Sequence, residues 1–245
     1  MSLALLATPK RRTVPFSLFF VAVFALGALA VALADPTVGT WYIGSLGIAV
    51  MVGGGIRGLK LNMPKQTELL ILGTVGSLAA CVFGATFITQ IAPVGAIEYY
   101  NLVLPLSTVQ AVEVWSFGVQ LIGWLLSGVM LLAYLMYIAF NEEVVFRGSV
   151  LSVVDGVLAH KYRLLGRIAA IVGMACAFAG FHFLVKGAVF AWGPFLILSW
   201  LGTVWGVTSL ATGSIWPCVF SHMIWNALAF VQRGILLAMI LGVAV

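Results

Sequence analysis

The chain has 245 residues, of which 63% are hydrophobic and 8% are charged, with a formal net charge of +5. A soluble domain carries roughly 25% charged residues, so this composition excludes a soluble fold and indicates a polytopic α-helical membrane protein embedded in a lipid bilayer. The basic residues cluster between apolar runs, which we interpret by the positive-inside rule, and no nucleic-acid partner is expected.

The first half of the chain predicts three spans, at about residues 14–34, 38–56 and 69–92. Basic residues precede the first span and follow the second, which predicts a cytoplasmic N-terminus. The stretch Ala-Leu-Ala-Asp at residues 32–35 resembles a signal-peptidase site, and we expect an uncleaved first helix as the commoner alternative. Residues 93–113 carry no Lys or Arg and are expected on the outside.

The second half predicts a long fourth helix from near residue 115 to about residue 154, and spans at about residues 168–185 and 188–210. The basic stretch at residues 160–167 predicts a short interfacial helix or loop on the cytoplasmic side.

The stretch ATGSIWP, residues 211–217, predicts a tight cytoplasmic turn between two helices. Gly213 fits a helix C-cap, Ser214 an N-cap and Pro217 a first helical turn. The seventh span reaches about residue 232, and the apolar stretch beyond it is either a short eighth span or a continuation of the seventh. The sequence therefore predicts an all-α transmembrane helix bundle of about eight spans, or seven, forming one integral membrane domain over residues 1–245.

Few ionisable groups remain inside the predicted spans, and a charge at the centre of a bilayer costs roughly 2.5–3.5 kcal/mol on insertion scales. Such groups are tolerated when they pair, line a wet cavity or carry function. The ionisable residues at depth are Glu142, Glu143, Arg147, His182 and His222, and Asn226 adds one strongly hydrogen-bonding amide.

Helical spacing links these residues. Glu143 and Arg147 are four residues apart and suit an ion pair, while Glu142 is rotated by about 100° and can face elsewhere. Glu142 and His182 lie at similar heights, each about 20 Å from the connection between their helices. His222 and Asn226 point the same way from a third helix, so three helices can direct these groups into one cavity.

Each group also has a simpler interpretation. The Glu-Glu-Arg cluster alone fits a structural ion pair between helices as well as it fits a site, and each histidine alone is more often a hydrogen-bonded packing residue. Asn226 alone favours an amide bond between helices. Their occurrence together, at compatible depths, favours a functional site.

The absence of other protease motifs narrows the possible catalytic mechanisms. Gly-x-Ser-Gly is absent, both aspartates lie at helix ends, and no H-E-x-x-H occurs. A carboxylate and a histidine activating a water, with a histidine and an amide stabilising an oxyanion, remains the simplest scheme. Two histidines and a glutamate could still ligate zinc, and in that case the ligands would be Glu142, His182 and His222.

Three motifs then carry a resemblance to a known family. EEVVFRG (residues 142–148), FAGFH (residues 178–182) and TGSIWPCVFSHMIWN (residues 212–226) match E-E-x-x-x-R, F-x-x-x-H and H-x-x-x-N in order. In this order they resemble the CPBP family, which joins CAAX prenyl proteases of the Rce1 type with bacteriocin-processing enzymes and is also called the Abi family. The motifs cover about residues 140–226 and indicate a catalytic core at about residues 115–232.

The resemblance implies a glutamate-dependent intramembrane endopeptidase with an eight-helix core and a cavity open toward the cytoplasm. Glu142 would be the general base, assisted by His182, and His222 with Asn226 would form the oxyanion site. Glu143 and Arg147 would hold the helix and tune the carboxylate, and Phe178 would pack beside the site. No cofactor is expected, with zinc the alternative.

The expected substrate is a peptide or membrane-protein segment, prenylated or not. Two other functions stay open at this point. A non-catalytic scaffold or bacteriocin-immunity protein would keep the fold, and a transporter or channel would use a polar cluster at mid-membrane, although no inverted repeat is apparent.

Overall fold

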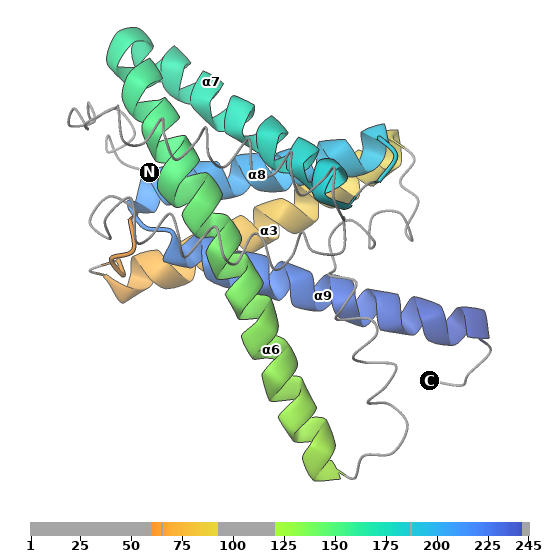
Figure 1. Ribbon diagram of the computed structural model, residues 1–245. Helices are drawn as coiled ribbons and strands as arrows, with labels where there is room; N and C mark the ends of the chain where they lie inside the picture. The colour runs from red at the N-terminus through yellow and green to blue at the C-terminus, as the bar shows by residue number, and fades with distance from the viewer. Residues whose placement is uncertain (1–59, 65, 93–120, 187, 242–245) are drawn as a thin grey trace.

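The computed structural model describes residues 60–64, 66–92, 121–186 and 188–241, and within these ranges all regular structure is helical. The all-α prediction is therefore confirmed over these ranges. The predicted spans at residues 14–34 and 38–56 and the connection at residues 93–113 lie outside them, so the number of spans stays a prediction. In chain order, the elements in Figure 1 are α3 (Thr67–Ile91), α6 (Leu121–Glu143), the π-helix η4 (Val144–Leu151), α7 (Ser152–Lys186), α8 (Trp192–Thr212) and α9 (Trp216–Leu241).

α6, η4 and the first part of α7 follow one another without a break and form a long helix that crosses α9 and α3 in Figure 1. The helix continues past residue 154, where the sequence predicts its end, and the chain reverses within residues 160–167, where a short helix or loop was expected. The chain stays helical until it reverses at Arg163, whose φ of 49° and ψ of −124° are the only non-helical angles inside α7. Proline is absent from α7, so nothing in its sequence ends the helix earlier.

The reversal makes α7 a hairpin, and this hairpin sets the heights of the site residues. Arg167 on the second limb donates to Asp155 on the first, with a distance of 3.0 Å between Nε and Oδ1, and both side chains are largely buried. A Cβ atom at position 166 would lie 2.2 Å from the carbonyl oxygen of Leu158, so only glycine lets the limbs approach this closely. The limbs are therefore clasped close to the reversal.

The turn between α8 and α9 has the predicted capping residues. Gly213 has a φ of 67°, the left-handed conformation that glycine adopts without strain. The Ser214 hydroxyl accepts a 3.2 Å hydrogen bond from the backbone N–H of Trp216, as an N-cap does, and Pro217 lies in the first turn of α9. The N–H of Ile215 donates to the carbonyl of Lys60, which ties the segment before α3 to this turn.

α9 continues from Trp216 to Leu241 without interruption, so the last apolar stretch begins as a continuation of the seventh predicted span. Arg233 lies inside this helix and does not end it. The alternative of a separate eighth span is not found over the residues described here.

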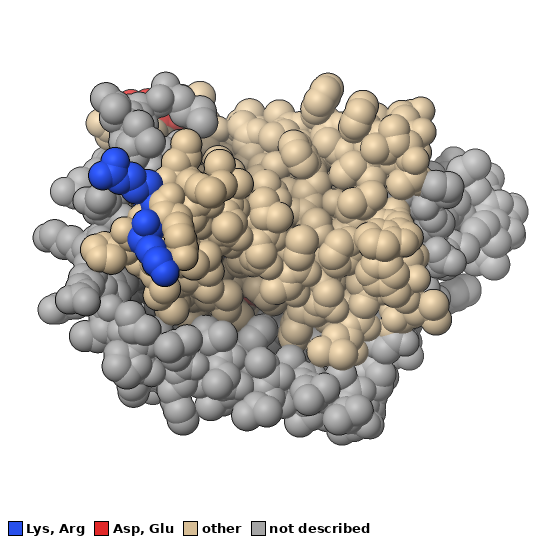
Figure 2. Space-filling view, turned by 90° about the horizontal axis from the view of Figure 1, so that it is seen from above, with Lys and Arg blue, Asp and Glu red and all other residues tan. Residues whose placement is uncertain are grey.

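The outer surface of the helices is apolar. In the described part of the chain, three stretches are long and apolar enough to cross a membrane: Thr67–Ile91, Leu132–Leu184 and Trp192–Thr212. Large side chains of α3, including Leu72, Phe83 and Phe87, are exposed, as lipid-facing residues are. Figure 2 shows Lys and Arg side chains gathered at one edge of the viewed face, with the described surface across the middle uncharged. These features are those of an integral membrane protein.

The buried core lies where η4, α7, α8 and the start of α9 meet. Phe146, Phe178 and Trp205 are almost completely buried there, and Phe146 meets Phe178 edge to face with 5.1 Å between ring centroids. The polar residues at depth lie against this aromatic core, which fixes their rotamers by close packing.

Candidate active site

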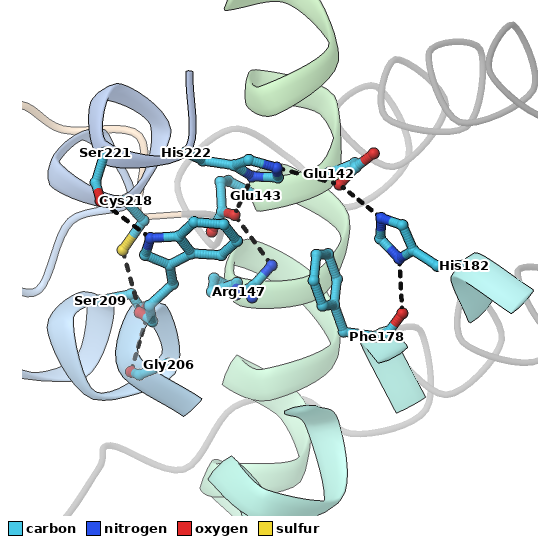
Figure 3. Close-up of polar contacts among 11 residues, drawn as sticks. Glu142, Glu143, Arg147, Phe178, His182, Gly206, Ser209, Cys218, Ser221 and His222 are labelled. Carbon is cyan, nitrogen blue, oxygen red and sulfur yellow. Dashed lines mark hydrogen bonds and ion pairs between the residues drawn. The ribbon is translucent and has the colours of Figure 1, made fainter. Parts of the chain in front are cut away.

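Glu142 lies between two imidazole rings that come from different helices (Figure 3). Its Oε2 atom is 3.8 Å from Nε2 of His182 on α7 and 3.6 Å from Nε2 of His222 on α9. The exposed fractions of these three residues are 5%, 8% and 3%. The structure therefore brings together the three residues for which the sequence predicts a shared cavity.

His182 reaches Glu142 because the α7 hairpin is nearly symmetrical. Glu142 lies 21 residues before Arg163 and His182 lies 19 residues after it, so the two arms carry them to the same level. The other ring nitrogen of His182, Nδ1, is 2.9 Å from the carbonyl oxygen of Phe178. Since a carbonyl only accepts, Nδ1 carries the proton, and in the neutral ring Nε2 then presents its lone pair toward Glu142.

His222 is held from its opposite nitrogen by the second carboxylate. Its Nδ1 lies 2.9 Å from Oε1 of Glu143, and the same oxygen accepts a 3.0 Å hydrogen bond from Nη1 of Arg147. The ion pair between Glu143 and Arg147 is the predicted one, and both side chains are fully buried. The contact between Glu143 and His222 was not predicted, because it depends on how α9 crosses α6.

Aromatic rings surround the guanidinium of Arg147. Its Cζ atom lies 4.4 Å from the ring centroid of Phe178 and 5.2 Å from that of Trp205. A desolvated cation gains about 2 kcal/mol from such ring faces. Phe178 also packs on His182, with 4.5 Å between ring centroids, so it lies beside the site as the sequence predicts.

Trp205 is a site residue that sequence reasoning missed. Its indole is stacked on the imidazole of His222, with 4.1 Å between ring centroids and 19° between the planes. Trp205 is one of many apolar residues in α8, with no charge or motif to mark it. Only its position, one turn from Leu201 on the buried stripe of α8, could have indicated a core residue.

Asn226 lies one turn beyond His222 on α9 and is 3% exposed. Its Oδ1 atom is buried and accepts no hydrogen bond from the described residues. The same holds for Oε2 of Glu142, which faces the two imidazoles. The structure therefore places Asn226 near the site in sequence and depth, and its role stays a prediction.

The site leaves both histidines with the Nε2 atom directed at one carboxylate, while each Nδ1 atom is engaged elsewhere. This arrangement is suited to holding a small polar group, such as a water, between an acceptor oxygen and the ring nitrogens. Neutral histidines anchored through Nδ1 are also the usual zinc ligands. Among the described residues, no group of three or more His, Cys, Asp or Glu side chains is arranged to hold a metal.

The comparisons with known proteins support one family. Residues 123–228 match the family model described as type II CAAX prenyl endopeptidase Rce1-like. The match covers less than half of the chain, and over these residues the chain is similar to the Rce1-like family. The match includes all three motifs and confirms the resemblance. Searches of curated proteins and of solved structures returned no match.

The similarity to this family bears on the class of activity. The Rce1-like family implies a protease, a hydrolase that acts on a peptide or protein substrate. The matched segment lies within residues 115–232, where the sequence predicts the catalytic core, and it contains Glu142, His182, His222 and Asn226. The extent of the single domain stays a prediction.

Proposed function

We propose that this Rce1-like protein is an intramembrane endopeptidase of the glutamic type, in which Glu142 activates the water that cleaves the peptide bond. The observation that carries the proposal is the approach of the two Nε2 atoms, at 3.8 Å and 3.6 Å, to one buried oxygen of Glu142. Both distances exceed those of direct hydrogen bonds, and Oε2 of Glu142 has no hydrogen-bond partner among the described residues, so a water that contacts these groups could supply the missing bonds.

Hydrogen-bond polarity favours a water at this position. The carboxylate of Glu142 only accepts, and Nε2 of neutral His182 also accepts, because its Nδ1 proton is used by Phe178. Two acceptors do not bond to each other, but a water can donate one hydrogen to each and keep a lone pair free for attack. Glu142 would take the proton as the water oxygen bonds to the carbonyl carbon, and would deliver it to the leaving amine when the C–N bond breaks.

The oxyanion formed in this step needs N–H donors, and His222 can supply one only in its protonated form. Its Nδ1 proton is directed at Glu143, so Nε2 must carry a second proton to donate. Charge balance supports this state. With Glu142 and Glu143 ionised and Arg147 cationic, one imidazolium makes the cluster neutral, and a neutral cluster is the least costly when buried. The amide NH₂ of Asn226 would be the second donor.

We further propose a substrate with a CAAX-type C-terminus, prenylated or not, that enters from the cytoplasm. The family description supports the substrate class. The basic residues Lys60, Lys161 and Arg163 support the direction, because Lys60 contacts the α8–α9 turn and the other two lie at the reversal of α7, where cytoplasmic charges are expected. We propose the same side for the N-terminus, because basic residues precede the first predicted span.

The proposal is tested with purified protein reconstituted in liposomes and offered prenylated and unprenylated CAAX-type peptides. Glu142→Gln is expected to abolish cleavage, and His182→Ala to lower kcat by about 10²–10⁴-fold, the usual contribution of a general acid–base group. Glu68→Gln, an exposed glutamate in the first turn of α3, is the matched control and should be as active as wild type. Full cleavage by both site variants would refute the proposal, and rescue of a cellular phenotype by Glu142→Gln would favour a non-catalytic scaffold.

A zinc-dependent form of the same peptidase is the second candidate, because both Nδ1 atoms are anchored as they are in zinc sites. Glu142, His182 and His222 would hold the ion, which would supply Lewis-acid chemistry. The water form is preferred, because the described residues include no group of three or more His, Cys, Asp or Glu side chains arranged to hold a metal. Metal analysis of active protein, and activity after chelation, distinguish the two forms.

A further inference from the structure

Trp205 has an unusual place in the site, because it contributes no ionisable group and yet contacts the residues that do. It is fully buried on α8, and its ring lies nearly parallel to the imidazole of His222 at 4.1 Å between centroids. The stack covers one face of the imidazole, while Glu143 engages the Nδ1 edge of the same ring.

Besides the stack on His222, two hydrogen bonds tie Trp205 to α9. Its indole N–H donates a 3.1 Å hydrogen bond to Oγ of Ser221, the residue before His222. Its backbone carbonyl accepts from Sγ of Cys218, one turn earlier on α9, at 3.1 Å. Figure 3 shows Ser221 and Cys218 on the same side of His222. The indole is therefore fixed relative to the helix that carries the imidazole, and its ring plane is set by a directional bond.

The same indole also completes a closed ring of four side chains. The guanidinium of Arg147 lies 5.2 Å from the centroid of Trp205 and bonds to Glu143, which in turn holds His222. His222 then stacks back on Trp205. Each member of this ring contacts two others, so the imidazole is held both at one atom and across one face.

We propose that Trp205 is a positioning residue that fixes the plane of the His222 imidazole. One hydrogen bond at Nδ1 leaves the ring free to tilt, whereas the stack restricts tilting and keeps Nε2 directed at Glu142, 3.6 Å away. This inference rests on the proposed function for its catalytic consequence, but not for its effect on the imidazole.

The kinetic test compares Trp205→Leu, which removes the aromatic face, with Trp205→Phe, which keeps one. Trp205→Leu should lower kcat by roughly 10–100-fold with little change in KM, since small misplacements of a catalytic group have effects of this size. Trp205→Phe should retain most of the wild-type activity. Trp200→Leu is the matched control, because Trp200 lies on the same helix and donates to the carbonyl of Ala80, away from the site. Equal kcat values for Trp205→Leu and Trp200→Leu would overturn the proposal.

A second readout does not depend on cleavage. The chain contains three histidines, so ¹⁵N spectra of histidine-labelled full-length protein can be assigned with His160→Gln and His182→Gln variants. In wild-type and Trp205→Phe proteins, the neutral ring of His222 should be a single tautomer with its proton on Nδ1. In Trp205→Leu, the two tautomers should average. An unchanged tautomer in Trp205→Leu would overturn the inference.

The two readouts separate the two proposals. Absence of cleavage by wild-type protein, together with the expected change in the His222 spectrum, would reject the peptidase and support the positioning role. If Trp205→Leu does not fold, Ser221→Ala decides, because it removes only the acceptor of the indole N–H. Ser221→Ala should lower kcat severalfold and broaden the His222 tautomer signals, and Ser221→Thr should restore both. No change in either measurement would overturn the proposal.

Discussion

Glu143→Gln tests the part of the site that the structure revealed and the sequence did not. Glu143 is fully buried, and its Oε1 atom accepts hydrogen bonds from both Arg147 and His222. The substitution keeps the size of the side chain and removes its charge, so Arg147 becomes a buried cation with no carboxylate bonded to it. Removing one partner of a buried ion pair costs about 3–5 kcal/mol. This is a large share of the 5–15 kcal/mol that stabilises a typical domain.

The catalytic effect of Glu143→Gln should exceed what lost stability explains. Without the carboxylate, His222 keeps at most a neutral amide oxygen as its acceptor and loses the negative charge that favours its imidazolium, so the proposed oxyanion donor is weakened or lost. Loss of one such donor lowers kcat by about 10²–10³-fold. Thermal unfolding in detergent and kcat on a CAAX-type peptide measure the two effects separately.

The double variant Glu143→Gln/Arg147→Met separates the two roles of the carboxylate. Replacing both members of a buried pair with uncharged residues of similar volume is often neutral or stabilising, so unfolding should return to near the wild-type temperature. Activity should stay low, because His222 still lacks the negative charge of the carboxylate beside it. Recovery of both stability and activity in the double variant would refute this reasoning, since Glu143 would then serve only the ion pair.

Three further predictions concern the fold. Asp155→Asn should destabilise the protein by about 3 kcal/mol, because Arg167 loses its carboxylate in the clasp of the α7 hairpin, and thermal unfolding measures this. Gly213→Ala should cost about 1–2 kcal/mol by placing a side chain at a φ of 67°, and Gly213→Asn should cost less. Gly84→Ala would place a Cβ atom 1.9 Å from Nε1 of Trp200 and should cost about 1–3 kcal/mol of stability. If this contact is the cause, the double variant Gly84→Ala/Trp200→Ala should lose less stability than the sum of the losses in the two single variants.

Local rules predicted the features that depend on helical spacing or on turn chemistry. The ion pair between Glu143 and Arg147 follows from a separation of four residues on one helix, and it forms at 3.0 Å. The caps at Gly213 and Ser214 follow from residue types with specific conformational and hydrogen-bonding properties, and both are present. These predictions needed no knowledge of how the helices pack.

Packing between helices decided what the sequence could not predict. The π-helix η4 follows Glu143 directly, and its wider turns allow Oγ of Ser152 to donate to the carbonyl of Arg147, five residues earlier. No residue type marks such a segment in advance, although π-helical turns are frequent at functional sites. The contact between Glu143 and His222 likewise depends on the crossing of α6 and α9, which are distant in sequence.

The geometry of the Glu143–Arg147 pair indicates that stability alone does not explain these charges in the membrane. A structural pair would be expected to form two parallel hydrogen bonds between guanidinium and carboxylate. Here the pair makes one, while Oε2 of Glu143 and both Nε and Nη2 of Arg147 have no hydrogen-bond partner among the described residues. Each unsatisfied buried atom costs about 1–3 kcal/mol, partly offset for Arg147 by the faces of Phe178 and Trp205. The oxygen that Glu143 does use is shared with His222. The pair therefore lacks its second hydrogen bond in an arrangement that holds the imidazole in place. This geometry favours a functional site over an ion pair that serves only stability.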